Sequence, residues 1–596
     1  MEVMIKDMND PTSARTYGGL EDDATVQRID MEQLAHDEDN VDNGKVEMLE
    51  DVNDGMQKPS ECGNRTFQLN KAQQRAVDIF IDHVDQLLQG LKPAPLRTIV
   101  FGEGGAGKSA IHSSIREALE ERRVPHWLMS CAPTGMAASL IDGKTAHSIG
   151  GFSGFNSAAS FNEPLPDETR KRLGPVWKDV RILVIDEMSM IPKDFLATLS
   201  RNISSVRPES PYSFGGISVL MMGDFMQFAP VGKKKHHPLY HPCNPQTDDA
   251  ITERGRKIYE EFTTVIELTE QHRVKDSVWH EVLTSMRNGT VEQRHIDILK
   301  GLVLGNDPAD DIDWYDAPWN DAVLVTSRNV VRDTWNELML RKKCAIDKKT
   351  VYVCPAQDTC RGAPAKMYEK CALLAGKKKK KDLLPHELEL AIGCKVLITN
   401  NVETDLDLTN GARGEVADII LNSDEPPFDP LAPIVRLKYA PLCVLVKVAR
   451  TKADQLDGLD AGVIPIELAE KNYTIKIRNS ESGTETTRSI KRRQLPLVLA
   501  YAFTDYKAQG QTLPYSLVDI ATPPHGRINL FNLYVALSRS VGRDTIRILR
   551  DFDSSLLKTK HDKILMDELD RLRSLSAATE QWYETVFKEQ RGYNYM

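Results

Sequence analysis

The stretch 102–109 combines glycines with a lysine and a serine in the pattern G-x-x-x-x-G-K-[ST]. It follows the apolar run 98–101 and precedes a helix-like segment, 110–115, so we expect a strand, a glycine-rich loop and a helix. Glycines let backbone N–H groups close around a polyphosphate, and the N-terminus of a helix adds partial positive charge. The alternative is a glycine-rich turn that fits the pattern by chance. The flanking strand and helix favour a binding loop for a nucleoside triphosphate.

The side chains in and near this loop suggest individual roles. Lys108 can reach the β- and γ-phosphates, and the Ser109 hydroxyl can ligate Mg²⁺. Gln73, on a helix predicted upstream, can read the adenine edge with one donor and one acceptor; an ordinary exposed helix glutamine is an equal alternative. We expect the phosphates to lie against the loop residues Gly102, Gly104, Gly105, Ala106 and Gly107.

Two carboxylates follow the apolar strand predicted at 182–185. Strand ends are where an α/β sheet presents its site, and a nucleotide hydrolase needs one acid for Mg²⁺ and another to polarise the attacking water. Asp186 fits the metal role and Glu187 the water role. The next strand leads to Gln227, which can hydrogen-bond the γ-phosphate or the water, unless it is an ordinary turn residue.

Hydrolysis also needs positive charge on the γ-phosphoryl oxygens in the transition state. An arginine from a second domain can supply it, and such a residue is worth on the order of 10³–10⁵ in rate. The candidates are Arg273 and Arg539, both far from the loop in sequence. A nucleotide gripped between two domains closes and opens them with each turnover, and such a cycle can drive movement.

Apolar strands alternate with helical segments both before and after the region 346–491, which has another pattern. This alternation predicts α/β units with parallel sheets covered on both faces. We expect a first unit at 66–260 and a second at 261–345 plus 492–560, whose strands are 264–268, 322–326, 497–500, 516–520 and 545–549. Between them, 346–491 has short β runs separated by turn residues, which predicts an inserted β-rich domain.

Three further segments have their own character. Residues 1–65 carry 17 acidic and 6 basic residues, so we expect a disordered acidic tail. Residues 149–176 are rich in Gly, Ser, Phe and Pro and form a predicted small insertion. In the C-terminal segment, 561–596, Leu565, Leu569 and Leu572 follow helical spacing, which predicts a packed amphipathic helix.

The bulk properties exclude several classes. The net charge of −10 resides in the tail, so the rest of the chain is near neutral and neither requires nor forbids a nucleic-acid partner. No apolar run approaches the roughly 18 residues of a membrane span, so we expect no membrane partner. Nine cysteines without a C-x-x-C pair suggest reduced thiols in an intracellular protein. The lysine runs 233–235 and 377–381 favour solvated loops; a phosphate-backbone contact or a nuclear-import signal is the alternative.

At this point the residues carry a resemblance to a known family. The series resembles superfamily-one DNA helicases, most closely the petite-integration-frequency (Pif) family, over about residues 66 to 552. Each matching segment is a weak signal alone, and the resemblance rests on their number, order and spacing. These segments are 69–73, 102–109, 132–138, 145–148, 186–190, 214–216, 223–227, 271–273, 410–414, 507–513 and 534–539.

The resemblance implies two RecA-like P-loop domains with ATP and Mg²⁺ between them and single-stranded DNA across both. It implies 5′→3′ translocation by a monomer, unwinding of tailed duplex DNA, and work in DNA repair, recombination or telomere maintenance. We then expect a nuclear protein, with mitochondria as the alternative. The β-rich segment resembles the family's small barrel domain, and 149–176 its wedge. The positions that match DNA-contacting motifs are Pro133, Thr134, Thr145, His147, Lys507 and Gln509.

The sequence departs from the family pattern around Lys507. The family usually has His before this lysine and Ser after it, whereas this chain has Tyr506 and Ala508. Tyr506 can still stack on a base, but a hydroxyl is missing at 508. Two other classes stay open: a P-loop ATPase that remodels protein, and a transposon-derived relic that only binds DNA. We find no paired-His nuclease motif.

Overall fold

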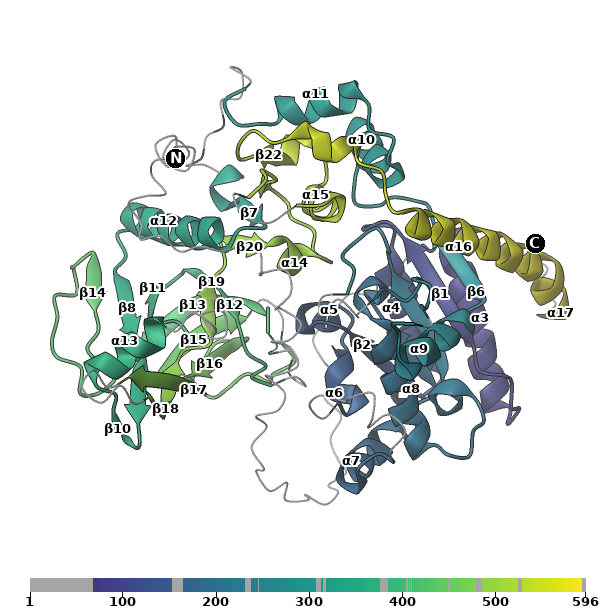
Figure 1. The fold of residues 1–596 in the computed structure, drawn as a ribbon, viewed down its shortest axis with the longest axis horizontal. Coiled ribbons are helices and arrows are strands. Elements are labelled where there is room, and N and C mark those ends of the chain that lie inside the picture. The colour runs from purple at the N-terminus through teal and green to yellow at the C-terminus, as the bar shows by residue number, and fades with distance from the viewer. Residues whose placement is uncertain are drawn as a thin grey trace.

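The computed structural model describes most of the chain from residue 68 onward. Its strands form two parallel sheets, each flanked by helices, and three smaller sheets to one side (Figure 1). This arrangement confirms the expected α/β class with a β-rich insertion. The described residues are 68–152, 164–230, 237–244, 246–306, 312, 314, 318–375, 384–403, 406, 408, 410–448, 451–478, 485–523 and 528–591. The predicted acidic tail, both lysine runs and residues 153–163 of the small insertion lie outside them.

The first parallel sheet has six strands in the order β3-β2-β4-β5-β1-β6. Every residue of β1, β4 and β5 is buried, because helices cover both faces of the sheet. The strands are β1 (Arg97–Gly102), β2 (Leu128–Ala132), β3 (Lys144–Thr145), β4 (Ile182–Ile185), β5 (Ser218–Gly223) and β6 (Thr264–Leu268). The helices are α3 (Lys71–Leu88), α4 (Lys108–Glu121), α5 (Gly135–Leu140), α6 (Ala146–Gly150), α7 (Asp167–Trp177), α8 (Lys193–Val206) and α9 (Ala250–Glu260).

Strand β6 belongs to this first sheet, so the prediction that 264–268 lies in the second unit is wrong. It pairs in parallel with β1, with Thr98 opposite Thr264 and Gly102 opposite Leu268. A Cβ on Gly102 would lie 2.5 Å from the Leu268 carbonyl oxygen, so glycine allows the two strand ends to approach. A short apolar strand looks the same in either sheet, and only its pairing partner decides where it belongs.

The second parallel sheet has four strands in the order β20-β7-β21-β22. Its strands are β7 (Val323–Thr326), β20 (Ala502–Thr504), β21 (Ser516–Asp519) and β22 (Ile546–Ile548). The helices of this unit are α10 (Ser277–Asn288), α11 (Gln293–Gly301), α12 (Asn329–Asp347), α14 (Asp505–Ala508) and α15 (Leu530–Leu537). The apolar cluster of the first sheet continues through Leu533, Leu537 and Ile546, so the two units share a core.

The prediction that 497–500 lies in this second sheet is also wrong. Strand β19 (Leu497–Leu499) pairs antiparallel with β12 (Lys395–Ile398) in the inserted region. The place in the parallel sheet is taken by β20, whose three residues are all buried. Asn336 of α12 holds the chain where it passes from β19 to β20. Its Oδ1 accepts hydrogen bonds from the backbone N–H groups of Tyr501 and Ala502, each at 2.9 Å.

The inserted region is β-rich, as expected, and its strands lie in three sheets with orders β16-β15-β13-β12-β19, β10-β9-β18-β17 and β11-β8-β14. One helix, α13 (Met367–Ala375), accompanies them. The remaining strands are β8 (Val351–Pro355), β9 (Gln357–Cys360), β10 (Ala363–Pro364), β11 (Glu387–Leu390), β13 (Arg413–Ile420), β14 (Ile434–Arg436), β15 (Cys443–Val448), β16 (Val463–Glu467), β17 (Ala469–Arg478) and β18 (Glu485–Gln494).

The C-terminal segment returns to the first unit as a long helix, α16 (Lys563–Trp582), followed by a π-helical turn and α17 (Lys588–Arg591). Figure 1 shows α16 alongside β6 and α3. The predicted packing is confirmed, because Leu565, Leu569 and Leu572 are buried in the shared core. Among the described residues, no helix has both the length and the apolarity needed to cross a membrane.

Candidate active site

The phosphate loop sits between a buried strand and a helix, as the pattern predicts. Strand β1 ends at Gly102, and α4 begins at Lys108 directly after Gly107, whose φ of 84° lies in the left-handed region. The Lys108 ammonium donates hydrogen bonds to the carbonyls of Gly102 at 2.7 Å and Glu103 at 2.9 Å. Burial lowers the pKa of Lys108, and the nearby carboxylates oppose this shift. The lysine is therefore anchored at the tip of the loop.

The structure places Gln73 against the loop rather than in an open position. Its Nε2 donates to the Gly107 carbonyl at 3.3 Å. Its Oε1 accepts from the Asn70 backbone N–H at 2.9 Å, and the Asn70 side chain accepts from the Gln73 N–H, so the two residues cap α3. Both ends of the amide are engaged with protein groups, which makes Gln73 a brace for the loop. Its recognition of adenine stays a prediction.

The two carboxylates lie at the end of β4, beside the loop. Glu187 has a φ of 51°, in the left-handed region that non-glycine residues rarely adopt, and its N–H donates to Asp186 Oδ1 at 2.9 Å. Burial, and then the charge of Glu187, raise the pKa of Asp186 to about 7. The strained backbone at Glu187 keeps the two acids next to each other at the end of β4, and strain of this kind is common in active sites.

The donor set here fits a magnesium ion that also binds phosphate. Among the described residues, no group of three or more His, Cys, Asp and Glu side chains could hold a metal alone. Mg²⁺ uses one or two protein ligands and completes its shell with water and phosphate oxygens. Exposed Ser109 and half-buried Asp186 supply a hydroxyl and a carboxylate of this kind. Their service as ligands stays a prediction.

A segment after β6 packs against the loop, and of the matching segment 271–273 only Arg273 was predicted as a site residue. The His272 N–H donates to the Gly105 carbonyl at 3.0 Å. Gln271 Nε2 donates to the Gly104 carbonyl at 3.2 Å and to Glu103 Oε2 at 3.1 Å. The signal for Gln271 and His272 was the polar run that follows a strand end.

Arg273 and Arg539 converge on the tip of the loop. A Cβ built on Gly104 would lie 3.1 Å from Arg273 Nη1 and 3.2 Å from Arg539 Nη2. Arg273 Nη1 donates to the Ser538 carbonyl at 3.1 Å, and Arg539 Nη2 donates to Ser538 Oγ at 2.7 Å. Within the described part of the chain, neither guanidinium has a carboxylate in ion-pair range. Burial, and then the charge of Arg273, lower the pKa of Arg539 to about 9. A bound anion would oppose this shift, because it stabilises the charged guanidinium.

Asp224 and Arg287 form a buried ion pair that sequence reasoning missed. Arg287 Nη1 and Nη2 donate to the two Asp224 oxygens at 2.6 and 2.8 Å. Gln227 Nε2 contacts the same carboxylate at 3.4 Å, and Arg287 Nη1 lies 3.4 Å from the Tyr534 hydroxyl. Arg287 is the penultimate residue of α10, and nothing local to its sequence marks it as part of the site.

Gln509 lies beside Glu187, and its predicted DNA contact stays a prediction. We expected this residue to lie on the DNA side, but its Nε2 donates to Glu187 Oε2 at 2.9 Å and its side chain is buried. The neighbouring Gly510 is also close, since a Cβ there would lie 3.4 Å from Glu187 Oε1. Sequence position could not reveal this, because 322 residues separate the two partners.

Four other predicted DNA-side residues follow β2 and β3 of the first sheet, whereas Lys507 lies on α14. Pro133 is buried, and Thr134 caps α5 by accepting from the Ala137 N–H at 3.2 Å. Thr145 caps α6, and the His147 ring packs 4.8 Å from that of Phe195. Burial lowers the pKa of His147 to about 4. These contacts give each residue a structural role, and a DNA contact stays a prediction.

Tyr506, the unusual residue before Lys507, stacks on the first unit. Its ring lies 4.1 Å from that of Phe228, and the two planes differ by 15°. Phe228 follows Gln227 directly, so the stack connects α14 with the segment that ends β5. Stacking on a nucleic-acid base, which we expected of Tyr506, is untested.

The phosphate loop lies at the carboxyl edge of one parallel sheet. Arg539 of the second α/β unit and Arg273 of the segment between β6 and α10 approach it, which is the arrangement of a P-loop nucleotide site between two RecA-like units. Residues 68–295 match the family model described as PIF1-like helicase, so this part of the chain is similar to that family.

Curated relatives are similar to the chain at low identity over a longer stretch. The chain is 26% identical over 526 residues to the ATP-dependent DNA helicase RRM3 of Saccharomyces cerevisiae, which covers 80% of this chain and 66% of that protein. It is 25% identical over 470 residues to the ATP-dependent DNA helicase PIF1 of Rattus norvegicus, covering 77% and 59%. The chain thus spans about three fifths of the length of these relatives.

Solved structures show the same fold. The Pif1 helicase of Candida albicans matches with a TM-score of 0.56 at 24% identity, over 85% of this chain and 99% of that one. The Pif1 helicase from Bacteroides in complex with ADP-AlF3 and single-stranded DNA matches with a TM-score of 0.54 at 20% identity, over 83% and 97%.

Proposed function

We propose that this protein is an ATP-dependent DNA helicase that moves 5′→3′ along single-stranded DNA and unwinds tailed duplexes. The observation that carries the proposal is the convergence of Arg273 and Arg539 on Gly104 of the phosphate loop. This geometry supports a triphosphate site between the two units, which would then move relative to each other when the triphosphate is hydrolysed. The yeast and rat relatives, both named ATP-dependent DNA helicases, supply the substrate class.

The residues suggest how hydrolysis proceeds. Glu187 accepts a proton from water as the water oxygen bonds to the γ-phosphorus, and the bond from that phosphorus to the bridging oxygen breaks, so ADP leaves with the electron pair. Lys108 neutralises the β- and γ-phosphates. Mg²⁺, held by Ser109 and Asp186, would supply further charge neutralisation on the phosphate oxygens.

The arginines act on the same charge, Arg539 from the second unit and Arg273 from the segment between β6 and α10. Arg273 and Arg539 stabilise the negative charge that builds on the γ-phosphoryl oxygens. Because their contacts to Ser538 hold them in place over the loop, little reorganisation is needed when the charge develops. Loss of the γ-phosphate removes the anion between the units and lets them separate.

The strand would cross both units. Thr134 and Thr145 lie at the carboxyl edge of the first sheet, and Lys507 lies on α14 of the second unit. Short hydroxyls, backbone N–H groups and a lysine suit phosphate contacts, which position a strand without reading its sequence. Polarity, action as a monomer, a nuclear or mitochondrial location and work in DNA maintenance come to this chain from its family.

One experiment tests the proposal. ATP hydrolysis by the full chain is measured with and without single-stranded DNA, followed by unwinding of 5′-tailed and 3′-tailed duplexes. We expect stimulation by DNA and unwinding of the 5′-tailed duplex only. Lys108→Ala should abolish hydrolysis, whereas Lys92→Ala, at an exposed position away from the loop, should not. Hydrolysis without DNA stimulation would favour a protein-remodelling ATPase, and DNA binding without hydrolysis would indicate a relic.

A further inference from the structure

Gln509 reaches from the second unit into the hydrolysis site of the first. Its Nε2 donates to Glu187 Oε2 at 2.9 Å, and its side chain is only 7% exposed. Glu187 is the residue proposed to activate water, so any role of Gln509 in hydrolysis rests on the proposed function. A buried glutamine that touches this carboxylate is placed to influence the reaction itself.

The other end of the same amide has no partner. Gln509 Oε1 is buried and accepts no hydrogen bond from any residue that the structure describes. A buried acceptor without a donor costs roughly 1–3 kcal/mol, so native proteins rarely keep one without a reason. With its nitrogen fixed on Glu187, this amide holds a free acceptor oxygen beside the catalytic carboxylate.

The water molecule that attacks in hydrolysis can donate two hydrogen bonds. Glu187 can accept one of them, and an amide oxygen beside it can accept the other, which turns the lone pairs of the water oxygen toward a third direction. Holding a reactant by two contacts instead of one fixes its orientation, and orientation contributes much of the rate of an enzyme reaction. The free oxygen of Gln509 matches this second contact.

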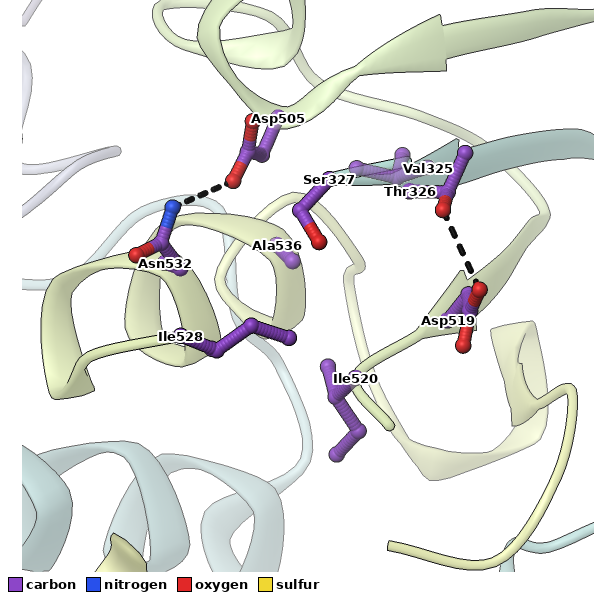
Figure 2. A pocket seen from close by; sticks show the side chains of 9 residues that line it. All are labelled: Val325, Thr326, Ser327, Asp505, Asp519, Ile520, Ile528, Asn532 and Ala536. Atoms are coloured by element: carbon purple, nitrogen blue, oxygen red, sulfur yellow. Dashed lines mark hydrogen bonds between the residues drawn. The ribbon is translucent and has the colours of Figure 1, made fainter. Parts of the chain in front are cut away.

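The segment that carries Gln509 is firmly held within the second unit. Asn532 Nδ2 of α15 donates to Asp505 Oδ2 at 2.5 Å, and Figure 2 shows these side chains facing each other beside a small pocket. Arg539 Nη1 donates to the Gln511 carbonyl at 3.3 Å. These two contacts join the segment 505–511 to the helix that leads to Arg539.

The same segment carries Lys507, the proposed strand contact. Gln511 Nε2 donates to the Lys507 carbonyl at 2.5 Å, which closes a tight turn around Gln509. A shift of Lys507 toward a bound strand would therefore change the position of Gln509 as well.

We propose that Gln509 binds the attacking water together with Glu187, and that its position two residues after Lys507 lets a bound DNA strand stimulate hydrolysis. The Gln509 oxygen accepts a hydrogen bond and takes no proton, so the proton still goes to Glu187. The competing view, that Gln509 contacts the strand directly, makes opposite predictions about rate and DNA affinity.

The test uses the full chain with Gln509→Ala and Gln509→Met, the second of which keeps side-chain volume without polar atoms. ATP turnover is measured while an oligothymidylate is titrated, and binding of the same oligonucleotide is followed by fluorescence anisotropy. We expect the maximal rate to fall by about 10²-fold, as for loss of one contact made in the transition state. The KM for ATP and the half-saturating DNA concentration should stay within about twofold of the unaltered protein's values. In this proposal Gln509 contacts the attacking water and binds neither ATP nor the strand. Gln293→Ala, on the exposed face of α11, is the matched control.

Two outcomes would overturn the proposal. A normal maximal rate with a half-saturating DNA concentration raised by about tenfold or more would make Gln509 a strand contact. A loss of rate that simply follows a loss of thermal stability in both variants would make it a packing residue. If the unaltered protein shows no DNA stimulation, the helicase proposal fails by itself, and the role of Gln509 in binding water is then read from the DNA-independent rate.

Discussion

Arg287 and Asp224 join the two α/β units through a pair of hydrogen bonds, 2.6 and 2.8 Å long, in the interior of the molecule. Asp224 is fully buried, and Arg287 is 9% exposed. Burial alone would raise the pKa of Asp224, but the charge and hydrogen bonds of Arg287 hold it below its ordinary value. The same arginine lies 3.8 Å from Glu103 of the phosphate loop, so this pair connects the loop with α10.

Arg287→Ala should destabilise the protein and slow hydrolysis. Removing one partner of a buried pair leaves an uncompensated charge, which typically costs about 3–5 kcal/mol. Arg287→Lys should be intermediate, because a lysine cannot donate in the forked geometry. Thermal unfolding and ATP turnover are the measurements, with Arg294→Ala on α11, an exposed ion-pair arginine, as the control. An Arg287→Ala protein as stable as the unaltered one would contradict the role of the pair.

Arg539→Ala and Arg273→Ala should each lower kcat by roughly 10³-fold, the lower end of the range for such arginines. ATP affinity should change little, because both residues act on charge that develops during the reaction. A lysine at 539 should restore little, since the guanidinium also donates to Val535 and Gln511 carbonyls at 2.7 and 3.3 Å. Nucleotide binding and single-turnover hydrolysis separate the two effects. Equal losses in the exposed control Arg172→Ala would show that the effect is not specific.

Tyr506→Ala should weaken the response to DNA. Its stack on Phe228 joins α14 to the segment after β5, and an aromatic pair contributes about 0.5–1.5 kcal/mol. We therefore expect the half-saturating DNA concentration to rise by about three- to tenfold, and Tyr506→Phe to retain the unaltered value. Tyr212→Ala, at an exposed ring on the first unit, is the control. A Tyr506→Ala protein with an unaltered DNA response would rule out this role.

The stability of the first unit should fall as the pH drops below about 6.5, the ordinary pKa of histidine. Burial lowers the pKa values of His83 and His112 to about 4. Between these values the unfolded chain binds more protons than the folded one, so this contribution is present above pH 6.5 and is lost as the pH falls through 4. Each histidine contributes up to roughly 3 kcal/mol, from about 1.4 kcal/mol per pKa unit.

His112→Gln provides the check on this pH dependence. His112 Nε2 lies 2.8 Å from Ser130 Oγ, and a glutamine can keep a hydrogen bond there without becoming charged. Urea unfolding at about pH 7 and about pH 5 should then show a smaller difference for the variant than for the unaltered protein. An equal difference in the two proteins would mean that His112 does not titrate on unfolding.

The sequence predicted those parts of the site that depend on neighbours in the chain. The loop at 102–109 and the acids Asp186 and Glu187 are local, because a strand, a turn and the side chains after it lie together whatever the rest of the chain does. Arg273 and Arg539 required the further assumption of a second α/β unit, and the structure brings both to Gly104.

Residues placed by long-range packing could not be found in this way. In the sequence, Arg287 looks like any other residue of an amphipathic helix. Its partner, Asp224, becomes visible only when α10 packs against the first unit. Gln509 was placed with its sequence neighbour Lys507, although the backbone turn at 508–511 sends its side chain to Glu187. Strand 264–268 was assigned to the wrong sheet for the same reason, since composition does not encode the identity of a pairing partner.

Helix α16 completes an edge of the first sheet that would otherwise be open. Strand β6 is the last strand of its sheet, and its outward N–H groups at Val265 and Glu267 donate to Thr579 Oγ1 and Ser576 Oγ, each at 3.0 Å. An exposed edge of this kind recruits strands from other chains and leads to aggregation. The hydroxyls of α16 occupy the groups that such a strand would use, so this helix also keeps the first sheet from growing into a neighbouring molecule.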